Sequence, residues 1–349
     1  MVSIINNRLR IGASIALVGA GALVFTACSS PAPTETTSAA TSDAGASGGV
    51  DPFAPEQSTV SVGAWRTTSS APLYIAQMDG IAEEYGLTLD LQYVENSPAA
   101  VSAVVGGSNN VGMASLWAVM SAINEGIDLR IIGEGFRHVQ NSMFMETLPG
   151  SGIESIEDLA GKKVGVTGLN AGHDLMIKNY FIENDLDPNS IEFVSLGYGE
   201  MGQALQTGAI DAGALTGPAL VQAREELGSV PVFDFIEQFE KFPATSYIVD
   251  GAWADANPNT IAAFQCAVVM RGAEIAREGG DEYEQSYIDA MAYGLDWDEA
   301  AVLGTTKINH VSENDAEWQQ IVPDLQFQNG LISEELNVAD FVIPLPENC

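Results

Sequence analysis

The sequence predicts an α/β protein of two similar lobes with a ligand cleft between them. From Ser58 onward, short β-rich runs alternate with segments of helical periodicity, which is typical of parallel α/β units. The same strand–helix–strand plan returns about a hundred residues later. A chain of 349 residues is long enough for two such units.

The first α/β unit is predicted between residues 58 and 94. Its first strand is Ser58–Val62, and a loop then leads into a helix that begins near Pro72. Apolar residues recur at helical spacing along this helix, and Gly86 is its expected end. The run Leu87–Val94 follows at once and predicts the second strand.

The second unit is predicted between residues 163 and 196. Lys163–Val166 indicates a strand, Thr167–His173 a loop, Asp174–Asn184 a helix and Ile191–Leu196 the next strand. This unit therefore follows the plan of the first one.

Two short segments support the repetition of one plan. In both Gly107–Ser115 and Gly208–Thr216, a Gly ends a helix, a tight turn follows, and a short strand of small residues ends in a hydroxyl. In open α/β sheets, ligands bind beyond the carboxyl ends of the strands, next to helix N-termini. We therefore expect the loops that follow the strands to carry the function.

The charge of the chain excludes one group of partners. There are 47 Asp and Glu residues against 13 Lys and Arg residues, a net charge of −34 at pH 7. A field of this sign repels nucleic acid and anionic lipid surfaces. We expect no nucleic-acid partner and interpret the acidity as a solubility feature of an exported protein.

The N-terminus has the features of an export signal. Arg8 and Arg10 precede the apolar run Ile11–Phe25. This run is shorter than the roughly 20 apolar residues that a membrane span needs. Residues 1–27 are therefore predicted to be a cleaved signal peptide.

The signal ends in a motif that resembles a bacterial lipobox. In Phe25–Cys28 the Cys would become the lipidated first residue of the mature protein, although Phe25 stands where the usual pattern has Leu. The alternative is an ordinary buried Cys in a plain secretory signal. Residues 28–57 form a Ser-, Thr-, Ala-, Pro- and Gly-rich tract, which predicts a flexible tether. We thus expect a lipid-anchored protein on the extracytoplasmic face of the cell membrane.

Three groups of residues carry a family resemblance. The first is Ala71–Ala76 with Gly80–Leu87, the second is Ile156–Val164, and the third is Gly208–Ala212. In this order and spacing they resemble the branch of periplasmic-type solute-binding proteins that serves nitrate, sulfonates, taurine and thiamine-related pyrimidines. The resemblance covers residues 60–277.

The resemblance implies a type II periplasmic-binding-protein fold, in which two lobes close on a ligand and two crossover segments form the hinge. The crossovers are expected near Asn141–Glu146 and Ser246–Trp253. The first lobe would then comprise residues 58–145 and the second residues 146–246. Residues 247–349 would return to the first lobe and end in helices.

The same resemblance implies a function. The protein would be the monomeric substrate-binding lipoprotein of an ABC importer, which passes a small molecule to a permease and its ATPase. The expected ligand is a small organic anion of the sulfonate, nitrate or taurine kind. The alternatives are a thiamine-related pyrimidine precursor as ligand, an exported pyrimidine-forming enzyme, and a sensor or adhesion lipoprotein that does not transport.

Acidic residues are absent from the loops where the cleft is expected. The stretches 63–72, 112–119, 165–173 and 212–219 contain none of the 47 acids. A cation site would need carboxylates there, whereas an anion site needs N–H groups, hydroxyls and an Arg. The candidate ligand-contacting residues are Trp65, Arg66, Thr67, Ser69, Asn96, Ser115, Trp117, Thr167, Asn170, Ala171, Gly172, His173 and Thr216.

These candidates also have plainer interpretations. Trp65 and Trp117 could stack on a flat ligand or belong to the core. Arg66 could pair with a carboxylate or sulfonate through two hydrogen bonds, or it could be an ordinary surface arginine. The loop Thr167–His173 could bind an anion at a helix N-terminus, or Asn170 could simply cap that helix.

The sequence lacks the signatures of catalysis and of cofactor or metal binding. The three His residues stand alone, and there is no G-x-S-x-G or Walker motif. Gly197–Gly202 is a formal G-x-G-x-x-G, but no acid follows at the end of the next strand, where a dinucleotide site needs one. The Cys-rich motif of the related pyrimidine synthases is missing too. We therefore expect a binding protein without enzyme activity, cofactor or metal.

The two cysteines beyond the lipobox are expected to form a disulfide. Export would place Cys266 and Cys349 in an oxidising compartment, and lipidation of Cys28 leaves an even pair. A bond between them would pin the C-terminal residue to a helix. The alternative is a buried free Cys266 beside a loose terminal thiol.

Overall fold

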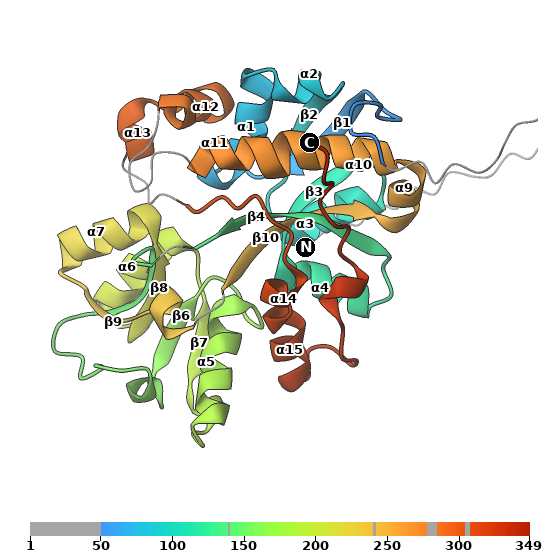
Figure 1. Ribbon diagram of the computed structural model, residues 1–349. Helices are drawn as coiled ribbons and strands as arrows, with labels where there is room; N and C mark the ends of the chain where they lie inside the picture. The colour runs from blue at the N-terminus through green and yellow to red at the C-terminus, as the bar shows by residue number, and fades with distance from the viewer. Residues whose placement is uncertain (1–49, 139, 240–241, 278–284, 304–307) are drawn as a thin grey trace, which may run out of the picture. The chain divides into compact units, whose positions relative to one another are not determined.

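The computed structural model describes residues 50–138, 140–239, 242–277, 285–303 and 308–349 (Figure 1). The expected signal peptide, Cys28 and the tether up to residue 49 lie outside the described residues. The remainder of the chain folds around two mixed five-stranded sheets, one in each lobe.

The first sheet is built from strands that come early in the chain together with one late strand. The early strands β1, β2 and β3 are parallel, and β10 runs antiparallel to β3 and β4, between which it lies. In order across the sheet, the strands are β2 (Thr88–Tyr93), β1 (Thr59–Ala64), β3 (Val111–Ser115), β10 (Pro243–Asp250) and β4 (Leu129–Arg137).

The second sheet repeats this arrangement. Strands β6, β7 and β8 are parallel, and β5 runs antiparallel to β8 and β9. The order across the sheet is β7 (Glu192–Ser195), β6 (Lys163–Val166), β8 (Ala212–Thr216), β5 (Met143–Thr147) and β9 (Val230–Asp234). The two-lobe α/β fold expected from the sequence is confirmed. The sheets are mixed because β5 and β10 each enter a sheet directly from the other lobe, in the opposite direction.

Both crossovers lie earlier than expected, the first by a few residues and the second by about ten. The chain leaves the first sheet after Arg137 and joins the second at Met143; it leaves the second after Asp234 and returns at residue 243. The expected hinge Ser246–Trp253 instead belongs to β10 and the start of the next helix. Ser246 is only 1% exposed, and its strand is paired on both sides. The lobe boundaries expected after residues 145 and 246 therefore move to about 142 and 242.

Helices surround both sheets, and most of them belong to the first lobe (Figure 1). Those of the second lobe are α5 (Gly172–Glu183), α6 (Tyr198–Thr207), α7 (Gly217–Leu227) and α8 (Phe235–Gln238). The others are α1 (Ala71–Met78), α2 (Ile81–Glu84), α3 (Ser97–Val105), α4 (Leu116–Asn124), α9 (Gly251–Ala256), α10 (Pro258–Phe264), a π-helix (Gln265–Gly272), α11 (Ala273–Arg277), α12 (Gln285–Leu295), α13 (Glu299–Leu303), α14 (Ala316–Gln319) and α15 (Ile321–Gln328).

Local sequence signals explain several helix ends. Pro72 lies in the first turn of α1, where its missing N–H costs nothing. The single helix expected up to Gly86 is divided into α1 and α2, because Gly80 adopts a left-handed conformation with φ of 72°. Gly208 ends α6 in the same way, with φ of 70°.

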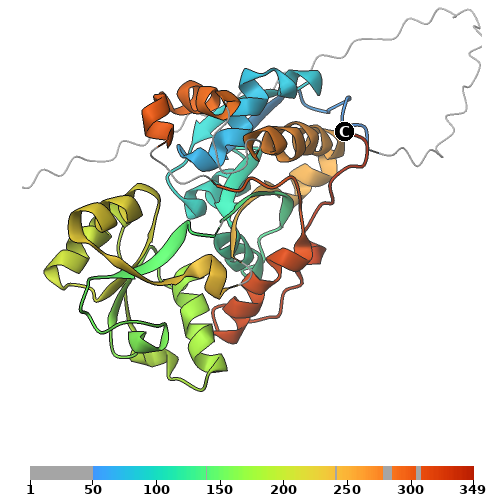
Figure 2. The same ribbon diagram turned by 60° about the vertical axis from the view of Figure 1, so that its left-hand side comes forward.

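The C-terminal segment ties the two lobes together. Helix α15 packs against α4 of the first lobe and α5 of the second (Figures 1 and 2). Its buried Val322 and Leu325 join a cluster of apolar side chains that includes Leu116 from α4 and Leu175 from α5. Further on, Val342 forms a bridge with Ile131, so that the tail extends the first sheet beyond β4.

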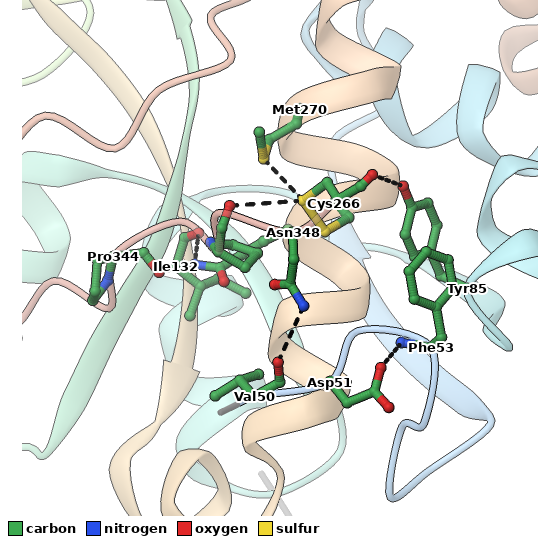
Figure 3. The surroundings of a disulfide bond; sticks show 12 residues. Val50, Asp51, Phe53, Tyr85, Ile132, Cys266, Met270, Pro344 and Asn348 are labelled. Carbon is green, nitrogen blue, oxygen red and sulfur yellow. Dashed lines mark hydrogen bonds between the residues drawn. A yellow bond between two sulfur atoms is a disulfide. The ribbon is translucent and has the colours of Figure 1, made fainter. Parts of the chain in front are cut away.

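A disulfide fastens the end of this tail. Cys349 and Cys266, in the π-helix, are joined with their Cα atoms 5.3 Å apart (Figure 3). The neighbouring Gln265 donates from Nε2 to the backbone oxygens of Ile132, at 2.9 Å, and Ile343, at 3.1 Å. The π-helix thus holds β4 and the tail through adjacent residues.

Candidate functional site

A cavity of about 1,200 Å³ lies between the two sheets. The loops that follow β1 and β3 form its wall in the first lobe, and those that follow β6 and β8 form its wall in the second. His138, Ser142 and Phe242 line it from the two crossovers. The cavity therefore lies beyond the carboxyl ends of parallel strands, where ligands bind in α/β folds.

All candidate ligand-contacting residues except Arg66 line this cavity. Those that do are Trp65, Thr67, Ser69, Asn96, Ser115, Trp117, Thr167, Asn170, Ala171, Gly172, His173 and Thr216. The structure therefore brings together residues that are up to 151 positions apart in the chain, from Trp65 to Thr216. That they contact a ligand stays a prediction.

Several of the hydroxyls already have partners within the protein. Thr67 Oγ1 lies 2.5 Å from Ser69 Oγ, and Thr216 Oγ1 donates to the backbone oxygen of Ser142 at 2.7 Å. Ser115 Oγ accepts from the Ala118 amide at 3.4 Å and so caps α4. A hydroxyl has one donor and two acceptor sites, so each of these side chains retains capacity for a ligand.

The loop before α5 is less open to an anion than the sequence suggested. The amides of Asn170 and Ala171 both donate to the carboxylate of Asp174, each at 2.8 Å. Asp174 is fully buried and pairs with Lys178 at 3.1 Å. A carboxylate of the protein therefore already occupies the helix N-terminus, and it lies one residue beyond the acid-free stretch. Asn170 does not cap the helix, because Ala171 holds the N-cap position.

The N-terminus of α7 is less occupied by the protein's own side chains. Its N-cap residue Thr216 makes no capping hydrogen bond with its side chain, and the helix begins with Gly217 and Pro218 at the cavity wall. Amides at a helix N-terminus that no side chain caps can donate to an anion or to a carbonyl oxygen of a ligand.

Aromatic rings from both lobes and both crossovers surround the cavity. They belong to Trp65, Trp117, Phe136, His138, His173, Tyr198, Phe242 and Trp297. Sequence reasoning missed five of these rings. Tyr198 follows β7 but was weighed only as part of a G-x-G-x-x-G segment. Phe136, His138, Phe242 and Trp297 do not follow a strand of the parallel units. Their only signal was their position near the crossovers and in the returning segment, which depends on the fold being known in detail.

Two neutral imidazoles lie among these rings. The ring of His138 lies against those of Phe136 and Phe242, with centroid distances of 5.3 and 5.5 Å. Burial lowers the pKa of His138 to about 3, and His173 contributes to this shift. Burial also lowers the pKa of His173 to about 4. His173 Nε2 lies 2.9 Å from Met143 Sδ. Both side chains are therefore uncharged at neutral pH and offer one donor and one acceptor each.

The cavity is otherwise almost free of charge. Its lining contains no Lys or Arg among the described residues, and its one carboxylate is that of Glu125. Arg66, the expected cation, lies outside this lining: it is exposed and stacks over Tyr93, with Cζ 4.8 Å from the ring centroid. The attraction of a guanidinium to an aromatic face explains this orientation.

The described residues contain no group of three or more His, Cys, Asp or Glu side chains that could hold a metal ion. No helix among them is long and apolar enough to cross a membrane.

Two sheets of one plan, with a cavity between the ends of their parallel strands, define the type II periplasmic-binding-protein fold, and solved structures share it. The aliphatic sulphonate binding protein SsuA from Escherichia coli matches with a TM-score of 0.66 and 17% identity, covering 82% of this chain and 97% of that one. The nitrate-binding protein NrtA from Synechocystis PCC 6803 matches with a TM-score of 0.64 and 14% identity, covering 83% and 87%. The fold also occurs in DszB, solved with biphenyl-2-sulfinic acid, at a TM-score of 0.56, 14% identity, and coverage of 82% and 96%.

The chain belongs to the NMT1/THI5 like family, whose model matches residues 67–282. A putative binding protein from Brucella abortus is 24% identical over 166 residues, which are 47% of this chain and 48% of that protein. The chain thus spans about half the length of the curated relatives that it matches.

Proposed function

We propose that this protein is the extracytoplasmic substrate-binding component of an ABC importer, and that it carries a small organic anion in the cavity between its lobes. The observation that carries this proposal is the cavity itself, since loops at the ends of strands from both lobes line it. The fold shared with SsuA and NrtA supports the same function. The partners would be a permease and its ATPase, with the binding protein acting as a monomer.

The lining supports an anion that also has an organic part. Hydroxyls from both lobes and the uncapped N-terminus of α7 offer hydrogen-bond donors, and the stretches 63–72, 112–119, 165–173 and 212–219, which follow β1, β3, β6 and β8, contain no acid. Rings as large as those of Trp65 and Trp117 are better matched to an organic group than to a bare inorganic ion.

A thiamine-related pyrimidine is a second candidate, because the cavity is rich in aromatic rings and its described lining lacks Lys and Arg. A flat ring could stack on the indoles and exchange hydrogen bonds with the neutral imidazoles of His138 and His173.

An enzymatic role is a weaker third candidate, supported by the fold shared with DszB. The neutral, mostly apolar lining offers no pair of carboxylates for acid–base work, Glu125 being its one acid among the described residues. Incubation of the purified protein with a bound compound, followed by mass spectrometry, would show conversion if the protein were an enzyme. We expect the compound to be recovered unchanged.

We also propose that lipidation of Cys28 holds the mature protein to the outer face of the cell membrane. A diacylglyceryl Cys provides the two acyl chains that stable anchoring requires. Replacement of Cys28 by Ala should release the protein into the medium. Retention of the C28A protein in the membrane fraction would contradict lipidation at this residue.

The ligand is best identified in two steps. Native mass spectrometry of the purified protein should show a co-purified small molecule that dissociates on denaturation. Calorimetry with taurine, alkanesulfonates, nitrate, arenesulfonates and 4-amino-5-hydroxymethyl-2-methylpyrimidine then measures affinity directly. Trp117→Ala should weaken binding of a compound with a ring about five- to a hundredfold, since base–aromatic stacking is worth about 1–3 kcal/mol. The proposal fails if the wild-type protein carries and binds none of these compounds.

A further inference from the structure

Arg66 keeps its guanidinium free of acids in a chain that is rich in them. Seven ion pairs are formed within the described part of the chain, and Arg66 takes part in none of them. The side chain is exposed, and its one contact of note is the stacking over Tyr93. Tyr93 is held in turn by a hydrogen bond from its Oη to the backbone oxygen of Gly294, at 3.2 Å. The guanidinium is therefore oriented by an aromatic platform, and its donors remain available.

This guanidinium borders a side pocket of about 760 Å³ next to the main cavity. The two spaces share a wall, and Thr167 and Tyr198 contribute to it from the second lobe. Glu95 is the one carboxylate among the residues that line the side pocket, and it forms no ion pair with Arg66 among the described residues. The residues common to both linings are Trp65, Thr67, Asn96, Ser97, Thr167 and Tyr198.

The two spaces differ in charge and chemistry. The main cavity is aromatic, and its described lining has no cation to neutralise an anion. The side pocket has a guanidinium, which matches the two oxygens of a carboxylate, phosphate or sulfonate. A molecule that lies in the main cavity and extends past Thr67 and Asn96 would reach Arg66.

We propose that the ligand has two parts, a flat uncharged organic portion in the main cavity and an anionic group in the side pocket at Arg66. This inference rests on the proposed binding function and adds where the anionic group lies. It also reconciles an aromatic, cation-free cavity with an anionic ligand. Because residues of both lobes line the side pocket, the anionic group would contact both lobes at the mouth of the cleft.

Two matched pairs of probes test the inference. One is 1-naphthalenesulfonate with 1-naphthalenesulfonamide; the other is the phosphate ester of 4-amino-5-hydroxymethyl-2-methylpyrimidine with the free alcohol. Calorimetry on the wild-type protein should show that the anionic member of at least one pair binds tenfold or more tightly than its neutral partner. This ratio should fall as salt is added, because the guanidinium is exposed. In Arg66→Gln the ratio should fall below about threefold, and Arg66→Lys should retain part of it because the charge remains.

Arg271→Gln is the matched control. Arg271 is a half-buried arginine that also stacks over a tyrosine, with Cζ 5.8 Å from the centroid of the Tyr85 ring. Unlike Arg66, it pairs with Glu84, and it borders neither pocket. Its loss removes the same charge and should leave the ratio as in the wild type. Thermal unfolding checks that each variant is folded.

The two proposals fail in different ways. Absence of binding of all four probes by the wild-type protein rejects the proposed class of ligand, and this inference with it. Three results reject only the placement of the anionic group at Arg66. The first is that the wild-type protein binds the probes without preferring the anionic one. The second is that the preference survives in Arg66→Gln, and the third is that Arg271→Gln abolishes it to the same extent.

Discussion

Trp117 and Gly172 meet across the cleft, so closely that a methyl group on Gly172 would lie 3.2 Å from the indole Nε1. Trp117 belongs to α4 of the first lobe and Gly172 begins α5 of the second. The indole has little room to retreat, because it is 7% exposed and its helix is held by Gln326 of α15, which donates to the Trp117 backbone oxygen at 2.9 Å. This contact makes the spacing of the lobes sensitive to a single atom.

Gly172→Ala should therefore weaken binding of the tightest compound from the ligand screen several-fold. The added methyl group would also lie 3.2 Å from Phe242 Cζ, so two rings of the cavity would have to shift. Calorimetry measures the affinity, and the shift of tryptophan fluorescence on binding reports on Trp117. Gly199→Ala is the control, because a methyl group at this position of α6 meets nothing within 4 Å. Equal affinities of the two variants would contradict this prediction.

Glu134→Ala should lower the free energy of unfolding by about 3–5 kcal/mol, the usual cost of removing one member of a buried ion pair. Glu134 is 3% exposed and accepts two hydrogen bonds from Arg137, each at 2.8 Å. It also accepts from the Asp315 amide at 3.0 Å and so fastens the C-terminal segment to β4.

Glu313→Ala is the matched control, since Glu313 pairs with the same Arg137 at 3.1 Å but is 54% exposed. Its loss should cost less than about 1 kcal/mol. Urea unfolding of both variants gives the comparison. If the two losses are equal, burial does not decide the strength of these ion pairs.

Sequence reasoning located most of the candidate site because that site depends on one topological rule. Hydroxyls such as Thr67, Ser115 and Thr216 follow parallel strands, and parallel strands place their carboxyl ends at one edge of a sheet. The rule needs only the strand positions, and Lys163–Val166 was predicted with its observed bounds. Elements defined by local periodicity were therefore predicted well.

What failed depends on long-range pairing. Strands β5 and β10 look like any other buried strand, and only their pairing with distant neighbours shows that the chain has already changed lobes before Met143 and again before residue 243. For the same reason Trp297 could not be placed at the cavity, since it comes from the returning segment. The exclusion of Arg66 from the cavity follows from its stacking on Tyr93, a contact that no periodicity predicts.

Removal of the disulfide should destabilise the protein and loosen its tail. In the chain-entropy model, a bond that closes a loop of 83 residues contributes about 4–5 kcal/mol. Cys349→Ser should lower the midpoint of thermal unfolding. It should also increase hydrogen exchange at residues 341–348, a segment that pairs with β4 at the edge of the first sheet through Val342. Peptide mapping of the unreduced wild-type protein should recover a linked pair of peptides that contain Cys266 and Cys349. Two free thiols at these residues in the unreduced protein would contradict the bond.

The stability of the protein should fall as the pH decreases from about 6.5 toward 4. The pKa values of His138 and His173 are lowered by burial to about 3 and about 4, whereas an imidazole of the unfolded chain titrates near 6.5. Between these values the unfolded state binds more protons than the folded state, so the free energy of unfolding rises with pH in this window. Above the window, the stabilisation that comes from keeping these two imidazoles neutral is fully present. His173, which is 6% exposed, should alone contribute on the order of 3 kcal/mol to the loss by pH 4.

This prediction is checked by measuring thermal unfolding midpoints at half-unit intervals from pH 7 to pH 5. In roughly this window imidazoles titrate and most carboxylates do not. The wild-type midpoint should fall steadily through the window. His173→Gln removes the titrating group at a site where the imidazole contacts Met143 and Phe235, so it should lower the midpoint at pH 7 but give a flatter slope below pH 6.5. Parallel slopes for the wild-type and H173Q proteins would mean that His173 is not the buried neutral imidazole that drives the acid sensitivity.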